Sequence, residues 1–166
     1  MIRRALIVAA FAALPGAGHA LSCLPHDVAA VFHQVHGSPD IYIGAYGKLT
    51  FDSERLPVVD WEHQETTPPQ TAVPARLRGH ALSADGFKIP FDRRVMLHVQ
   101  CAGPWCAQPV SGAMYMGFLK SGQSGYSLTI GPCGGDAFAD PDAASLETAR
   151  QCFAGGPCVP NTDFPQ

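Results

Sequence analysis

The chain has 166 residues, of which 46% are hydrophobic and 15% are charged, and its formal net charge is −3 with neutral histidines. This length suits a single domain with one core and leaves little room for two. The weakly negative charge gives no footprint for nucleic acid or for anionic lipid, so neither is expected as a partner.

The first twenty residues have the order of a secretion signal. Arg3 and Arg4 precede an apolar run over residues 5–14, and small residues lead to a cleavage site after Ala20. The run is too short to span a bilayer, so we expect no stable membrane insertion after cleavage and a secreted or periplasmic protein. Residues 21–166 then form the mature domain, with 9 basic against 14 acidic residues and a charge of −5. The alternative is an N-terminal core helix.

The mature part opens with a helix followed by a strand. Apolar residues from Val28 to Val35 recur at helical spacing, Asp27 can cap the start, and Gly37 can end the helix. Residues 41–51 alternate as a strand does, and Gly44 and Gly47 within them indicate a bulge or bend that curls the sheet.

Residues 56–74 are rich in proline and threonine, which predicts a long surface loop. After it, residues 77–82 and 87–91 flank a turn at Asp85 and Gly86 and predict a hairpin. The alternation continues over residues 95–101, and residues 101–106 form a turn with a cysteine at each end.

A second hairpin is predicted for residues 113–120 and 126–133, around the glycine-rich loop 121–125. Asp140 and Pro141 then provide a cap and first position for a helix that runs through Cys152. Short strands at this spacing, in so small a domain, favour a mainly β fold with a closed or nearly closed barrel between two terminal helices.

All six cysteines lie in the mature part, and an even number in an exported chain indicates three disulfides. Short separations favour two local pairs, and the remaining two cysteines would then close a long loop, which gives Cys101–Cys106, Cys152–Cys158 and Cys23–Cys133. A lipoprotein with an acylated Cys23 is the alternative, although it would leave one thiol unpaired.

The chain resembles the netrin-like modules, whose animal members include the tissue inhibitors of metalloproteinases. The likeness rests on Cys23 just after the signal, residues 39–44 as a first strand, the hairpin of residues 115–133 and the terminal cysteine-bearing helix. It implies an OB-fold-like barrel and a protease as one candidate partner. In those inhibitors the first cysteine is the mature N-terminus and chelates the zinc of the target. That mechanism requires a start at Cys23 rather than at Leu21.

Three histidines near the N-terminus, His26, His33 and His36, are the candidate metal ligands. Neighbouring neutral imidazoles can hold copper or zinc, which raises the hypothesis of a periplasmic metal carrier. No carboxylate or thiolate shares their arc of the helix, and surface histidines are ordinary. Asp136, Asp140 and Asp142 could bind calcium, but a capped helix start explains them more simply.

No catalytic motif is complete. Four residues separate Cys101 from Cys106, where a thiol oxidoreductase has two, so a structural staple is favoured over the alternative of a thiol-disulfide redox protein. Ser124 lacks a nucleophile elbow, and His63 lacks the second histidine of a metalloprotease. We therefore expect no enzyme activity and no cofactor.

Aromatic residues remain as a candidate binding surface. Tyr42 and Tyr46 share one face of the first strand, with Trp61 in the proline-rich loop beside it. The alternative is that a terminal helix covers the tyrosines. The sequence thus predicts a binding module for an unidentified protein partner.

Overall fold

The computed structural model describes residues 21–161, so the predicted signal peptide lies outside the described residues. The elements in chain order are α1 (Val28–His36), β1 (Ile41–Phe51), the short 3-10 helices η1 (Ser53–Arg55) and η2 (Gln64–Thr66), β2 (Gln70–Ser83), β3 (Gly86–Ala102), β4 (Trp105–Cys106), β5 (Met114–Gly122), β6 (Gly125–Gly131), β7 (Gly134–Gly135), β8 (Ala137–Ala139) and α2 (Ala143–Phe153).

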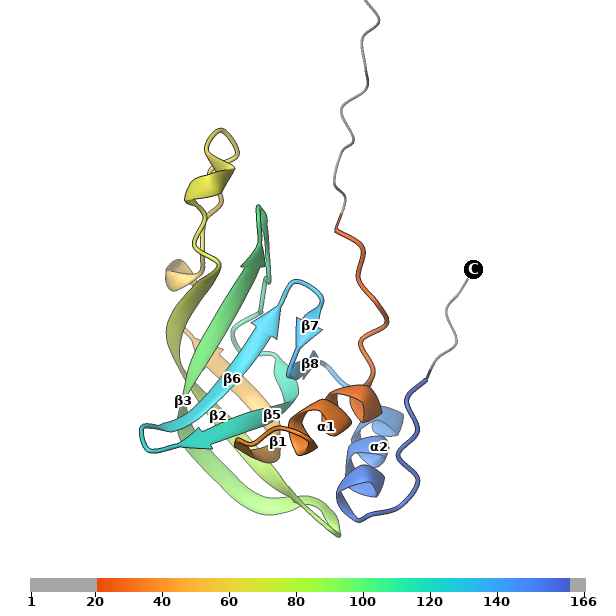
Figure 1. Ribbon diagram of the computed structural model, residues 1–166. Helices are drawn as coiled ribbons and strands as arrows, with labels where there is room; N and C mark the ends of the chain where they lie inside the picture. Colours follow the sequence, from red (N-terminus) through yellow and green to blue (C-terminus); the bar gives the residue numbers. More distant parts are fainter. Residues whose placement is uncertain (1–20, 162–166) are drawn as a thin grey trace, which may run out of the picture.

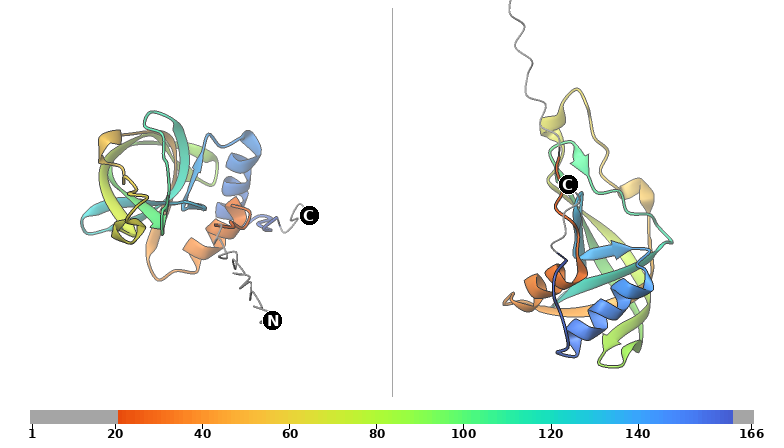
Figure 2. Two further views of the ribbon diagram at one scale, coloured as in Figure 1. Left: turned by 90° about the horizontal axis from the view of Figure 1, so that it is seen from above. Right: turned by 90° about the vertical axis from the view of Figure 1, so that its right-hand side faces the viewer.

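Five strands close into a barrel. β1 lies between β2 and β5, β3 pairs with β2, and β6 pairs with β5, all antiparallel. The parallel pair β3–β6, with Val95 opposite Tyr126, completes the ring. Seen from above, the strands form a closed ring and both helices lie outside it on one side (Figure 2). This strand order is that of an OB-fold-like barrel, as predicted.

The barrel interior is filled by alternate residues of every strand. Period-two alternation sends Leu49, Val73 and Leu77 inward, where each is at most 1% exposed. Leu97, Leu119 and Leu128 meet them from β3, β5 and β6 in the same apolar cluster. Burial of these side chains out of water is the main stabilising contribution to the fold.

A second apolar cluster lies between the outer surface of the barrel and the helices. Val28, Val31 and Val35 form the buried stripe of α1, and they meet Met116 and Phe118 of β5. Figure 1 shows α1 and α2 side by side against this flank of the barrel. The helices therefore cover part of the sheet and leave the rest of its outer surface open.

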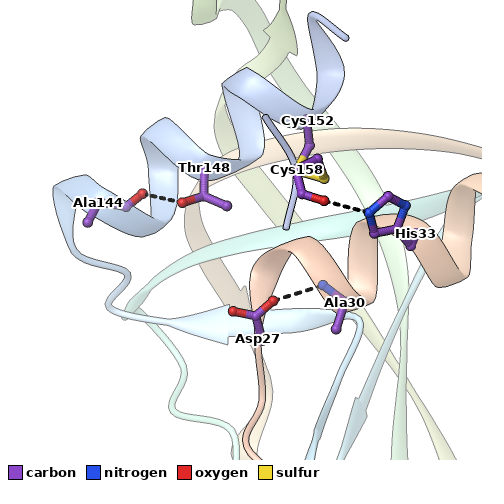
Figure 3. The surroundings of a disulfide bond; sticks show 7 residues. All are labelled: Asp27, Ala30, His33, Ala144, Thr148, Cys152 and Cys158. Atoms are coloured by element: carbon purple, nitrogen blue, oxygen red, sulfur yellow. Dashed lines mark hydrogen bonds between the residues drawn. A yellow bond between two sulfur atoms is a disulfide. The ribbon is translucent and has the colours of Figure 1, made fainter. Parts of the chain in front are cut away.

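The caps confirm one predicted helix start and correct the other. Asp27 accepts a hydrogen bond from the Ala30 backbone N–H at 2.9 Å and caps α1, as predicted (Figure 3). The prediction of Asp140 as cap of α2 was wrong. Asp142 is the cap and accepts from the Ser145 N–H at 2.7 Å, whereas Asp140 has a left-handed φ of 41° and directly follows β8.

The predicted loop over residues 56–74 was too long, because β2 already begins at Gln70. Residues 70–74 pair only with β3, beyond the end of β1. Pro74 therefore lies in an edge segment, where a missing N–H is tolerated.

Of the bulge or bend predicted at Gly44 and Gly47, the bulge is absent from β1. β1 runs through Gly44 and Gly47 without a register shift, and the irregularity lies in the β2–β3 pair, between Ala81 and Leu82. Gly47 and Gly79 face each other, and a Cβ on either would collide with the opposite backbone. These two glycines thus allow a close approach of the strands.

Three disulfides join the six cysteines, and the predicted pairing is confirmed: Cys23–Cys133, Cys101–Cys106 and Cys152–Cys158. Such a set is typical of an oxidising compartment. Among the helices of residues 21–161, none is both long and apolar enough to cross a membrane.

Candidate functional site

One end of the barrel carries a hollow with exposed apolar walls. Its volume is about 540 Å³, and we call it the apical hollow. The residues that line it are Leu21, Pro57, Val58, Val59, Trp61, Pro104, Trp105, Cys106, Gln108 and Pro132. They come from the N-terminal segment, the β1–β2 loop, the β3–β4 tip and the segment after β6. Figure 1 shows the β1–β2 loop projecting beyond the barrel, at the end away from the β2–β3 turn.

Large apolar side chains at this end remain open to solvent. Val58 is 87% exposed, Trp61 65% and Trp105 39%. Single exposed apolar residues are common, but several around one hollow indicate an interaction site. Tryptophan is also one of the residues enriched among the energetic anchors of protein interfaces.

The β3–β4 tip that carries Trp105 is held rigidly. Cys101 and Cys106 are directly opposite each other in the ladder and are joined by a disulfide. Gly103 has φ +60° and makes the tight turn between them possible. The Cys101 N–H donates to the Pro69 carbonyl at 2.9 Å, which ties the tip to the end of the β1–β2 loop.

Local hydrogen bonds order the loop around Trp61. Asp60 Oδ1 accepts from the backbone N–H groups of Glu62 and His63 at 2.9 and 3.2 Å, and Oδ2 lies 3.1 Å from the His63 ring. The bond from Glu62, followed by that from the His63 ring, holds the pKa of Asp60 below its usual value. The Trp61 carbonyl accepts from the Gln64 side chain. Trp61 therefore lies within a turn that the Asp60 carboxylate stabilises.

The N-terminal segment reaches the hollow through a disulfide. Cys23 is bonded to Cys133, which follows Pro132 of the lining. Leu21, two residues before this bridge, is 37% exposed and lines the same hollow. The bridge thus brings a segment far away in sequence beside the β3–β4 tip.

The structure does not gather the three candidate metal-ligating histidines into one site. His26 stacks on Phe138 with ring centroids 4.0 Å apart, and its Nε2 donates to the Gly135 carbonyl at 2.8 Å. His33 Nε2 donates to the Cys158 carbonyl at 2.7 Å, across to the segment after α2 (Figure 3). His36 stacks on Phe32.

Within residues 21–161, no group of three or more histidine, cysteine, aspartate or glutamate side chains is placed to hold a metal ion. The candidate calcium ligands also have other roles: Asp142 caps α2, and Asp140 accepts a hydrogen bond from the Met114 N–H.

Tyr42 and Tyr46 do not share a surface with Trp61. Both are half-buried in the cluster under the helices, and Tyr46 packs edge-on against Phe87 at 5.8 Å. Burial, with the negative charges of Asp136 and Asp40, raises the pKa of Tyr42. The alternative of covered tyrosines therefore describes these two residues, and only Trp61 of the predicted surface lies at the hollow.

Sequence reasoning missed Leu21, Val58 and Trp105. A signal for the last two was present, because each follows a proline in a predicted loop or turn, where an apolar side chain has no core to enter. What the sequence alone could not give is that these loops meet at one end of the barrel.

Comparison with known proteins gives no match to a family model, to a curated protein or to a solved structure. The geometry of the apical hollow therefore carries the functional argument.

Proposed function

We propose that this chain is an exported binding module without chemistry of its own, and that it docks a protein partner on the apical hollow. The observation that carries the proposal is the pair of exposed tryptophans, Trp61 and Trp105, on separate segments around one hollow. Aromatic anchors bind with little loss of conformational entropy, since a tryptophan side chain has only two rotatable bonds.

The segments that line the hollow are held in place by disulfides and hydrogen bonds, which favours recognition by a preformed surface. Two disulfides hold the β3–β4 tip and the N-terminal segment, and the β1–β2 loop is joined to the tip through Pro69. A site built from loops on a rigid barrel is a common arrangement for binding proteins. The three disulfides agree with an oxidising compartment, secreted or periplasmic.

The resemblance to the metalloproteinase inhibitors suggests one way in which the chain could bind a partner, namely inhibition of a protease. Zinc chelation by the first cysteine needs Cys23 as the mature N-terminus. Leu21 lines the hollow, so a chain that begins at Leu21 contributes an apolar contact there instead. We therefore favour apolar docking of a partner over chelation.

Site-specific photocross-linking tests the proposal. A photoreactive phenylalanine analogue placed at Trp61 or at Trp105 in the exported protein is expected to give one discrete adduct with a partner. The matched control is the same analogue at Ile89, which is 53% exposed and lies near the β2–β3 turn. Equal adducts at all three positions, or adducts at Ile89 alone, would contradict docking at the hollow.

A further inference from the structure

The open part of the sheet carries a block of positive charge. On the outer surface of β1–β3, Lys48 is opposite Arg78, which is opposite Asp92, and in the next row Thr50 is opposite Arg76, which is opposite Arg94. We call these six residues the cationic face. It holds four cations and a single carboxylate, on a mature chain whose overall charge is −5.

Two pairs on this face place like charges directly opposite each other. Lys48 faces Arg78 across β1–β2, and Arg76 faces Arg94 across β2–β3. Directly opposed residues have Cβ atoms about 5 Å apart, and like charges at this position destabilise a sheet. Such an arrangement opposes folding, so folding alone does not account for it.

Only part of this repulsion is offset. Asp92 accepts from Arg76 Nε at 2.6 Å and from Arg78 Nε at 3.3 Å. The hydrogen bond from Arg76 is the main reason why the pKa of Asp92 lies below its usual value. No acidic side chain of the described chain forms an ion pair with Lys48 or Arg94. The face therefore keeps an excess of three positive charges.

We propose that the cationic face binds an acidic polysaccharide, a polymer that carries sulfate, phosphate or carboxylate groups. Guanidinium groups bind such anions through two parallel hydrogen bonds, and a row of cations matches a polymer with repeated charges. A bound anion between the opposed cations would also remove their repulsion.

Two features favour a polysaccharide over other polyanions. None of the six residues is aromatic, and proteins that bind single-stranded nucleic acids use aromatic side chains for base stacking. None of the six is apolar either, whereas peripheral proteins enter a membrane with apolar anchors. The cationic face consists of strand residues, whereas loops and the N-terminal segment build the apical hollow, so this binding is separate from the proposed protein docking.

Binding to dextran sulfate, with neutral dextran as the reference, tests the proposal. The wild-type protein is expected to bind the sulfated polymer and to lose affinity as salt is added, because the contacts are electrostatic. The variant Lys48→Gln/Arg94→Gln is expected to bind about tenfold more weakly, a loss of roughly 1.4 kcal/mol. Asp92 and both of its partners remain in this variant.

The matched control is Arg55→Gln/Arg93→Gln, which removes the same net charge elsewhere. Arg55 lies in η1. Arg93 belongs to the set of β3 residues that alternates with Asp92 and Arg94, so it is not part of the cationic face. This control is expected to bind as the wild type does. Equal weakening by both double variants would overturn the proposal, because net charge alone would then explain binding. Tighter binding to single-stranded DNA or to phosphatidylglycerol vesicles than to the sulfated polymer would overturn it as well.

A folding readout accompanies the binding one. The melting temperature of Lys48→Gln/Arg94→Gln is expected to equal or exceed that of the wild type, since repulsion is relieved. A lower melting temperature would contradict the claim that repulsion between these cations destabilises the folded protein.

Discussion

The two surfaces of β1–β3 differ although their residues alternate along the same strands. Leu77 points into the barrel and is 1% exposed, while its neighbours Arg76 and Arg78 lie outside in solvent. The inner surface consists of apolar residues that fill the barrel. The outer surface is divided between a part packed under α1 and α2 and the open cationic face.

This difference separates the residues that specify the fold from the residues that are available for binding. Inner residues stabilise the barrel through burial, so their replacement should cost stability. Outer residues in the open part contribute little to burial and even repel one another. The part under the helices should be intermediate, because its stability depends on how the helices are capped and tethered.

The largest effect is expected inside the barrel. Leu77→Ala should destabilise the protein by about 2–5 kcal/mol, because it removes buried methyl groups and leaves a cavity. Urea unfolding followed by far-ultraviolet circular dichroism measures the change. The adjacent Arg78→Ala should leave the unfolding midpoint almost unchanged, and similar losses for both would contradict the division between the surfaces.

The long disulfide should come next. Replacing Cys23 and Cys133 with serine removes a link between residues 110 apart and should cost about 2–4 kcal/mol, by the effect of loop length on the unfolded state. The pair Cys101 and Cys106, separated by 5, should cost less when replaced. Urea unfolding of both variants decides the order, and the reverse order would show that local strain outweighs loop length.

The cap of α2 should give a smaller effect. Asp142→Ala removes the acceptor for the Ser145 N–H and should lower the melting temperature by about 2–4 °C. Asp140→Gly serves as control. It removes only the exposed bond that Asp140 accepts from the Met114 N–H at 3.3 Å, and glycine adopts the left-handed conformation of this residue without strain. Calorimetry should show little loss for Asp140→Gly. If Asp140→Gly lowered the melting temperature more than Asp142→Ala, Asp140 rather than Asp142 would be the cap of α2.

Asp136 should give a pH-dependent effect. Burial raises the pKa of this carboxyl, against the opposing influence of the Thr129 hydrogen bond and of His26. Its contribution to stability is therefore present at low pH and is lost as pH rises through the raised pKa. Asp136→Asn should thus be more stable than the wild type at neutral pH, and the gain should disappear below about pH 4. A gain that grows on acidification would contradict this sign.

The smallest effect is expected on the open surface. Lys48→Gln alone should leave the melting temperature unchanged or slightly raised, because the lysine faces Arg78. Differential scanning calorimetry at low and high salt measures this, and the difference should shrink as salt screens the repulsion. A marked loss of stability would show that Lys48 supports the fold.

Much of the fold could be predicted because local patterns determine it. The alternation of residues 41–51, the cap at Asp27 and the short cysteine separations each depend on neighbours in sequence. The errors arose where two local signals competed. Asp140 and Asp142 are both good caps, and only the end of β8 decides between them. Pro74 forbids a central strand but not an edge, and edges are known only once the sheet is assembled.

The site was less predictable because it is a property of the assembled molecule. Tyr42 and Tyr46 were expected on a surface with Trp61, but the helices cover them. Trp105 and Leu21 meet Trp61 only through the barrel closure and the Cys23–Cys133 bridge. The net charge of −3 likewise gives no sign of the cationic face, because strand register gathers its four cations on one surface.

The central claim is that the apical hollow docks a protein partner. Its most direct test is the dissociation constant for the partner identified by cross-linking, measured for the wild type, for Trp61→Ser/Trp105→Ser and for Ile89→Ser. The double variant should bind roughly 500-fold to 1,000-fold more weakly, because two anchors of about 2 kcal/mol each together contribute about 4 kcal/mol, and Ile89→Ser should bind as the wild type does. A double variant that binds with wild-type affinity would contradict the claim.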